Sequence, residues 1–170
     1  MIIAITGRPG SGKTTLLMKV LTKIRGVGFY TKEIREGRRR IGFVAVTSWG
    51  EEVLLAKVGI DSPYKVGKYG VLVPQFEEKV VNPLKEMAEK ESLIYIDEIG
   101  KMELFSKKFV SFLEDLLKVN KNLLITIPAK DVHTVVRKFR QSADLLIDAW
   151  KYWDKKEEAA RLIIDRLARR

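Results

Sequence analysis

The chain has 170 residues, of which 46% are hydrophobic and 32% are charged, a balance typical of a single globular domain and not of a disordered segment. It contains no cysteine and one histidine, His133, which excludes a disulfide scaffold, thiolate chemistry and a multi-histidine metal centre. The formal net charge of +10 favours binding to phosphate, nucleic acid or acidic membranes without choosing among them.

The expected compartment is the cytoplasm. The chain does not open on a basic segment followed by a long apolar stretch, and no apolar run approaches the length of a membrane span. Asparagine and glutamine are scarce, which together with the many charges is typical of a heat-adapted protein.

Apolar runs alternate with amphipathic stretches along the first half of the chain, which predicts an α/β fold for a single domain spanning residues 1–170. A strand is predicted at residues 2–6, and a glycine-rich loop leads from it into a helix at residues 13–24. Residues 28–35 and 40–47 predict an inserted β-hairpin, extended by residues 52–57. Residues 58–74 are rich in glycine and proline and predict irregular chain with short strands.

The second half continues the alternation of strands and helices, which predicts a mainly parallel central sheet flanked by helices. Helices are predicted at residues 75–90, 105–119, 131–140 and 154–168, the last capped by Asp154. Strands are predicted at residues 93–97, 123–127 and 145–147. The first of these is apolar on both faces, as expected for a central parallel strand.

Residues 7–14 read Gly-Arg-Pro-Gly-Ser-Gly-Lys-Thr and match the phosphate-loop pattern G-x-x-x-x-G-K-[ST] at every fixed position. The glycines allow the backbone to curve around an anion, and the following helix directs unpaired N–H groups toward it. Lys13 supplies a mobile positive charge for the β- and γ-phosphates, and Thr14 supplies a hydroxyl for Mg²⁺. The motif predicts a nucleotide-binding site.

Asp97 and Glu98 follow the apolar strand directly, at the strand end where ligands bind in this class of fold. We expect Asp97 to hold Mg²⁺ from the side opposite Thr14. Glu98 is suited to aligning or deprotonating a water molecule for attack on the terminal phosphate. A water-preparing carboxylate favours a hydrolase over a kinase, which must exclude water.

Three segments carry a resemblance to a known family: residues 7–14, the hairpin residues 28–35 with Gly42 and Phe43, and the run Asp-Glu-Ile-Gly-Lys-Met-Glu-Leu at residues 97–104. In motif order and length the chain resembles the small P-loop nucleoside-triphosphatases of archaea and thermophilic bacteria, and is similar to the human cancer-related nucleoside-triphosphatase. The resemblance implies a P-loop NTPase fold and Mg²⁺-dependent hydrolysis of ATP, GTP and other nucleoside triphosphates to the diphosphate and phosphate, with broad base tolerance.

The motif chemistry and the resemblance together predict a set of site residues. Lys13, Asp97 and Glu98 are expected to be catalytic, and Thr14 and Asp97 are expected to hold the metal. Nucleotide contacts are expected on the phosphate loop and on the strand-end segment: Gly7, Arg8, Pro9, Gly10, Ser11, Gly12, Lys13, Thr14, Thr15, Asp97, Glu98, Ile99 and Gly100.

Other residues admit both a functional and a structural interpretation. Arg137 is a candidate for stabilising charge in the transition state, and Arg140 shares its position near the polar face of a predicted helix. Glu103 is suited to anchoring its turn. The aromatic run at residues 150–153 is suited either to loose stacking on a base or to packing against the last helix.

Two alternative functions remain open. A nucleotide or small-molecule kinase of the same fold would transfer phosphate to an acceptor other than water. A nucleic-acid-stimulated NTPase would use the basic surface, including the arginines at residues 38–40, although no RNA- or DNA-reading motif accompanies them. We expect a monomer whose partner is the nucleotide.

Overall fold

The structure is a computed structural model that describes residues 1–169. Its centre is one nine-stranded sheet with the strand order β5-β6-β4-β3-β2-β7-β8-β1-β9. The strands are β1 (Ile2–Gly7), β2 (Val27–Glu36), β3 (Arg39–Thr47), β4 (Glu52–Val58), β5 (Lys65–Val66), β6 (Tyr69–Val71), β7 (Leu93–Ile96), β8 (Asn122–Pro128) and β9 (Leu145–Asp148).

The sheet has a parallel half and an antiparallel half. Strands β2, β7, β8, β1 and β9 pair in parallel, and β3, β4, β6 and β5 continue the sheet from β2 in antiparallel pairs. The predicted α/β architecture is therefore confirmed. The expected hairpin is part of the same sheet, because β2 pairs with β7 at its start and with β3 along most of its length.

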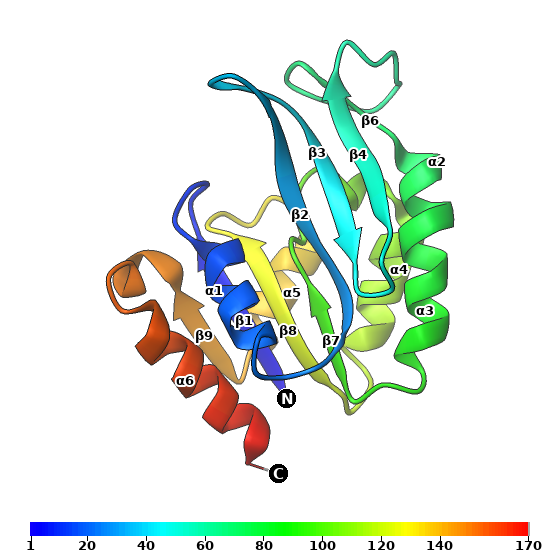
Figure 1. Cartoon of the computed structure of the whole chain (residues 1–170). Coiled ribbons are helices and arrows are strands. Elements are labelled where there is room, and N and C mark those ends of the chain that lie inside the picture. The colour runs from blue at the N-terminus through cyan, green and yellow to red at the C-terminus, as the bar shows by residue number, and fades with distance from the viewer. Residues whose placement is uncertain (170) are drawn as a thin grey trace.

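Helices cover both faces of the parallel half (Figure 1), with α1 (Lys13–Leu21) and α6 (Lys156–Ala168) on one face and α3 (Asn82–Ala88), α4 (Lys107–Leu116) and α5 (Thr134–Ser142) on the other. The short helix α2 (Val73–Phe76) continues into α3 through the π-helical segment η1 (Glu77–Val81). Two single turns of 3₁₀ helix complete the fold, η2 (Glu103–Phe105) and η3 (Ala149–Tyr152).

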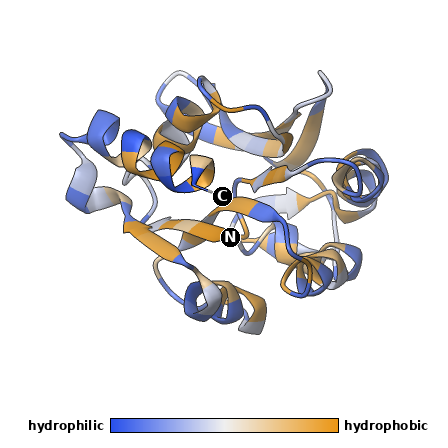
Figure 2. Cartoon of the chain, turned by 90° about the horizontal axis from the view of Figure 1, so that it is seen from below, coloured by the Kyte–Doolittle hydropathy of each residue, from blue (hydrophilic) through white to orange (hydrophobic). Residues whose placement is uncertain are grey.

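Side chains that alternate along the central strands create two separate hydrophobic cores. In β1, Ile3 and Ile5 pack beneath α1 and α6, whereas Ala4 faces the core under α3, α4 and α5. In β7, Leu93 and Tyr95 enter the first core and Ile94 the second. The sheet seen from below is correspondingly hydrophobic between helices with hydrophilic outer faces (Figure 2). Burial on both faces explains the continuous apolar runs of these strands.

Several predicted boundaries differ from the structure by up to three residues, among them both ends of α4 (Lys107–Leu116) and α5 (Thr134–Ser142), which were predicted at residues 105–119 and 131–140. Helix α1 ends at Leu21 and not at residue 24, and the predicted helix at residues 75–90 begins earlier, at Val73. Asp154 does not cap the last helix, which begins at Lys156 without a side-chain cap. The reason is that the chain after β9 first turns through η3, whose N-terminal cap is Asp148. At α5, the His133 ring accepts a hydrogen bond from Val135 N, which is a capping role.

No helix within the part of the chain that the structure describes is long and apolar enough to cross a membrane.

Candidate active site

The loop between β1 and α1 has the backbone geometry that anion binding requires. Gly10 and Gly12 have φ values of 78° and 94°, in the left-handed region that residues with a side chain seldom adopt. Gly12 is the N-terminal cap of α1. The first N–H groups of the helix have no partner within it. They therefore point toward the space that the loop encloses, as does the positive end of the helix dipole.

The start of this loop is tightly packed. A Cβ atom added at Gly7 would lie 2.3 Å from Ser11 Oγ, so a side chain at position 7 would collide with the returning loop. Ser11 Oγ is buried, and it has no hydrogen-bond partner among the described residues. Because buried hydroxyls normally have partners, this oxygen is free to take part in binding a polar ligand.

Lys13 links the loop to the acidic segment after β7. Its ammonium Nζ lies 2.8 Å from Gly7 O and 2.8 Å from Glu98 Oε2. The Lys13 side chain is largely buried, with 10% exposed, whereas 31% of the Glu98 side chain is exposed. The positive charge is thus held inside the loop, next to a carboxylate that reaches toward solvent.

Asp97 lies at the centre of a hydrogen-bond network at the carboxyl ends of the parallel strands. Its Oδ2 accepts from Thr14 Oγ1 at 2.8 Å and from Thr31 N at 3.3 Å. Its Oδ1 accepts from Thr126 Oγ1 at 2.5 Å. Burial raises the pKa of the Asp97 carboxyl above its usual range, although the hydrogen bonds from Thr126 and Thr14 oppose that rise.

The oxygen atoms around Asp97 fit a small hard cation. A carboxylate and a hydroxyl in contact are the ligands that Mg²⁺ takes at phosphate-loop sites, where substrate oxygens and water supply the remainder. Residues 1–169 contain no cluster of three or more acidic, histidine or cysteine side chains that would hold a metal by itself. A cation at Thr14 and Asp97 would therefore depend on the substrate for further ligands.

Glu103 is a second buried carboxyl beside the site, only 5% exposed. Its Oε1 accepts a hydrogen bond from Gly100 N at 3.2 Å. Burial, with a further contribution from the charge of Glu98, raises the pKa of Glu103 to about 8. The anchoring contact to Gly100 fixes the turn that carries Glu98.

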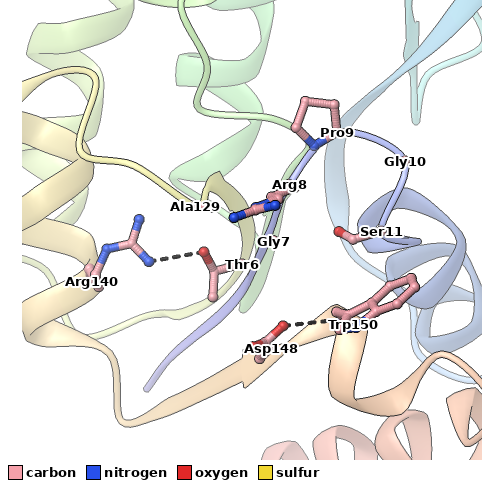
Figure 3. Close-up of a pocket in the computed structure, with 10 residues that line it drawn as sticks. All are labelled: Thr6, Gly7, Arg8, Pro9, Gly10, Ser11, Ala129, Arg140, Asp148 and Trp150. Carbon is pink, nitrogen blue, oxygen red and sulfur yellow. Dashed lines mark hydrogen bonds between the residues drawn. The ribbon is translucent and has the colours of Figure 1, made fainter.

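A pocket of about 690 Å³ opens beside the phosphate loop. Figure 3 shows Arg8 and Arg140 reaching into it from opposite walls, with Trp150 near Ser11. Arg140 is fixed there, because its guanidinium donates to Thr6 Oγ1 at 2.9 Å and to Pro128 O at 2.5 Å. Arg137 lies exposed on α5 and does not line this pocket.

The other residues that are expected to contact the nucleotide differ in how accessible they are. Pro9 and Gly10 line the pocket, and Thr15 is exposed on α1. Ile99 is fully buried, and its N–H donates to Thr126 O at 3.0 Å. Its side chain therefore belongs to the core.

Sequence patterns do not identify two polar side chains that lie at the site. Thr126 donates to Asp97, and Thr6 accepts from Arg140. The sequence does contain a signal for Thr126, because it is the polar residue within the buried apolar run of β8. A buried hydroxyl needs a hydrogen-bond partner, so a polar contact was to be expected there. The partner itself could not be identified without the order of the strands.

A parallel sheet whose first strand enters a lysine-bearing glycine loop, with an acidic pair at the end of a nearby strand, defines a phosphate-loop nucleotide-binding protein. Comparison with known proteins gives the family. The family model described as NTPase matches residues 2–152, and the chain belongs to this family.

Curated relatives support the same assignment. The nucleoside-triphosphatase THEP1 of Thermotoga maritima is 45% identical over 148 residues, covering 86% of this chain and 84% of the relative. The human cancer-related nucleoside-triphosphatase is 39% identical over 141 residues, covering 74% of each chain.

Solved structures agree with the fold. The crystal structure of THEP1 from Aquifex aeolicus superposes with a TM-score of 0.85 at 39% identity, covering 95% of this chain and 98% of that one. The solution structure of the human cancer-related nucleoside triphosphatase gives a TM-score of 0.79 at 32% identity, covering 99% of this chain and 98% of that one. The resemblance seen in the sequence motifs is confirmed.

Proposed function

We propose that this protein hydrolyses nucleoside 5′-triphosphates, including ATP and GTP, to the diphosphate and phosphate in a Mg²⁺-dependent reaction. One observation carries the proposal: the loop lysine and the loop threonine each contact one member of the acidic pair, Lys13 to Glu98 and Thr14 to Asp97, both at 2.8 Å. The names of the relatives, which are nucleoside-triphosphatases, support the same reaction.

The loop binds the phosphates through main-chain N–H groups and the Lys13 ammonium, which neutralise a dense negative charge. Thr14 and Asp97 would hold Mg²⁺ through their side-chain oxygens. When bound, this ion neutralises charge that develops on the β- and γ-phosphate oxygens. Thr126 and the Thr31 N–H keep the Asp97 carboxylate in position by hydrogen bonds.

Glu98 is the group that prepares water for attack. Its side chain is the more exposed partner of the Lys13 ion pair, and a carboxylate there accepts a proton from water as the new bond to phosphorus forms. We expect the Lys13 ammonium to move from Glu98 to the phosphates when a nucleotide binds. The binding of substrate would thereby free the Glu98 carboxylate for its catalytic task.

The test is a phosphate-release assay on Glu98→Gln. Gln keeps the shape of the side chain but cannot take a proton, so we expect turnover to fall by about 100-fold or more while nucleotide affinity changes little. Glu91→Gln is the matched control, since Glu91 is an exposed carboxylate before the start of the same strand, β7. Normal turnover in Glu98→Gln would show that another group prepares the water.

The same assay separates the alternative functions. It uses ATP, GTP, CTP and UTP, with and without Mg²⁺, and it repeats each reaction with added nucleosides, nucleoside monophosphates or RNA. A hydrolase releases phosphate at the same rate whether or not an acceptor is present. Transfer to an acceptor would instead identify a kinase, and a rate that rises with RNA would identify a nucleic-acid-stimulated enzyme.

A further inference from the structure

Two tryptophan side chains project from the protein after β9 and are largely exposed. Trp150 is 66% exposed and Trp153 is 45% exposed, and their rings lie 5.6 Å apart at an angle of 43°. The third tryptophan, Trp49, packs against the hydrophobic core. Large exposed aromatic side chains that lie side by side commonly mark a binding surface.

The backbone under this aromatic pair is firmly held. Ala149 is buried and Tyr152 packs against the core beneath α1 and α6. Asp148 caps the turn by accepting a hydrogen bond from Trp150 N at 3.1 Å. Trp150 and Trp153 are therefore displayed on a rigid turn and not on a loose loop.

The pair lies directly beside the phosphate loop. Trp150 lines the same pocket as the loop residues from Gly7 to Ser11 (Figure 3). A Cβ atom added at Gly12 would lie 3.7 Å from Trp153 and 3.0 Å from the Lys156 side chain. A nucleotide whose phosphates are bound by the loop would have its base and ribose within reach of this surface.

Lys156 adds to the fixed arrangement. Its ammonium lies 4.1 Å from the centre of the Trp153 ring and donates to Trp153 O at 2.8 Å. Lys156 and Trp150 both contact the Trp153 ring, and Trp150 is the more exposed of the two indoles.

The polar side chains that line the pocket outside the phosphate loop already have hydrogen-bond partners. Thr6 and Arg140 are bonded to each other on the wall opposite Trp150 (Figure 3), and Asp148 is engaged with Trp150 N. An aromatic ring, by contrast, stacks on any base, because every base presents a π face.

We propose that the indole of Trp150, supported by Trp153, is the stacking surface for the base of the nucleoside triphosphate and gives affinity with little preference among bases. This inference rests on the proposed function, since it assigns the base position for the same substrate. It also gives a physical reason for broad base tolerance.

The test measures equilibrium binding in the Glu98→Gln background, where the nucleotide stays intact. We expect Trp150→Ala to weaken binding of ATP, GTP, CTP and UTP by about 5- to 100-fold, as loss of one stacking contact predicts. Trp150→Phe should retain most of the affinity. Inorganic tripolyphosphate has no base. Its affinity for the Glu98→Gln protein should therefore be the same within about twofold whether residue 150 is Trp or Ala.

Leu146→Ala is the matched control, because Leu146 is an apolar side chain of β9 that is 45% exposed. Unchanged nucleotide affinity in Trp150→Ala would overturn the proposal. An equal loss for tripolyphosphate would also overturn it, since Trp150 would then support the phosphate loop and not the base. Failure of the proposed function is distinguishable, because it would appear as absent phosphate release in the wild-type protein, whatever the binding results.

Discussion

Glu103 shows at the scale of one residue how the fold changes the chemistry of a side chain. The carboxyl is buried beside Glu98 and Asp97, and both negative charges add to the effect of burial in raising its pKa to about 8. At neutral pH the side chain is therefore mostly protonated. It holds the Gly100 N–H without adding another negative charge to a site that must accept phosphates.

The raised pKa predicts how stability depends on pH. The unfolded chain releases the Glu103 proton near its ordinary pKa of 4.5, whereas the folded chain keeps it until about pH 8. Between these values the unfolded state binds fewer protons, so the free energy of unfolding falls as pH rises, by up to about 1.4 kcal/mol per pH unit. Below pH 4.5 this contribution is fully present.

We expect Glu103→Gln to flatten that decline, because Gln has no proton to lose. Urea unfolding of the wild type and the variant at pH 5 and pH 8 measures the difference, with the exposed Glu91→Gln as control. An equally steep decline in Glu103→Gln would mean that another group is responsible.

Helix α5 shows at the scale of an element why the two candidate arginines are not equivalent. The helix presents Val135, Val136 and Phe139 to the core, which fixes its rotation. Arg140 then reaches the ends of β1 and β8, where it bonds to Thr6 and Pro128. Arg137 is exposed on the same helix.

This difference predicts unequal effects of substitution. We expect Arg140→Ala to lower turnover by about 10-fold or more, because a guanidinium beside the loop stabilises charge on the phosphates. The effect of Arg137→Ala should be much smaller. Steady-state phosphate release from both variants, with thermal unfolding to check that each is folded, decides between them. A larger loss of turnover in Arg137→Ala than in Arg140→Ala would indicate that Arg137 stabilises the transition state.

At the scale of the whole molecule, the site joins segments that lie far apart in the chain. The loop after β1, the acidic pair after β7 and Thr126 of β8 meet at one edge of the sheet. A ligand bound there contacts several elements of the parallel half at once. Because it binds the folded state alone, it should stabilise the entire domain.

A non-hydrolysable ATP analogue with Mg²⁺, at 100 times its Kd, should stabilise the protein by about 2.7 kcal/mol. For a domain of this size that corresponds to a rise in Tm of about 5–10 °C. Lys13→Ala should abolish most of the rise at the same concentration, and AMP, which lacks the outer phosphates, should produce little. A full shift in Lys13→Ala would contradict the phosphate site described above.

The sequence by itself determined the order of strands and helices, the phosphate loop and the position of the Asp97-Glu98 pair. These features have local signals: alternation of apolar side chains, glycines at fixed spacing, and acids directly after a buried strand. Only the tertiary structure shows which of these side chains contact one another. Lys13 and Glu98 are 85 positions apart, and their contact depends on the strand order β7-β8-β1.

The same reason explains the position of Arg140 beside the phosphate loop, the burial of Glu103 and the exposure of Trp150. Each depends on which surface a neighbouring element covers, and helical periodicity fixes only the face of a helix that is apolar. Residue type and spacing therefore predicted the chemistry of the site, and packing determined which side chains reach it.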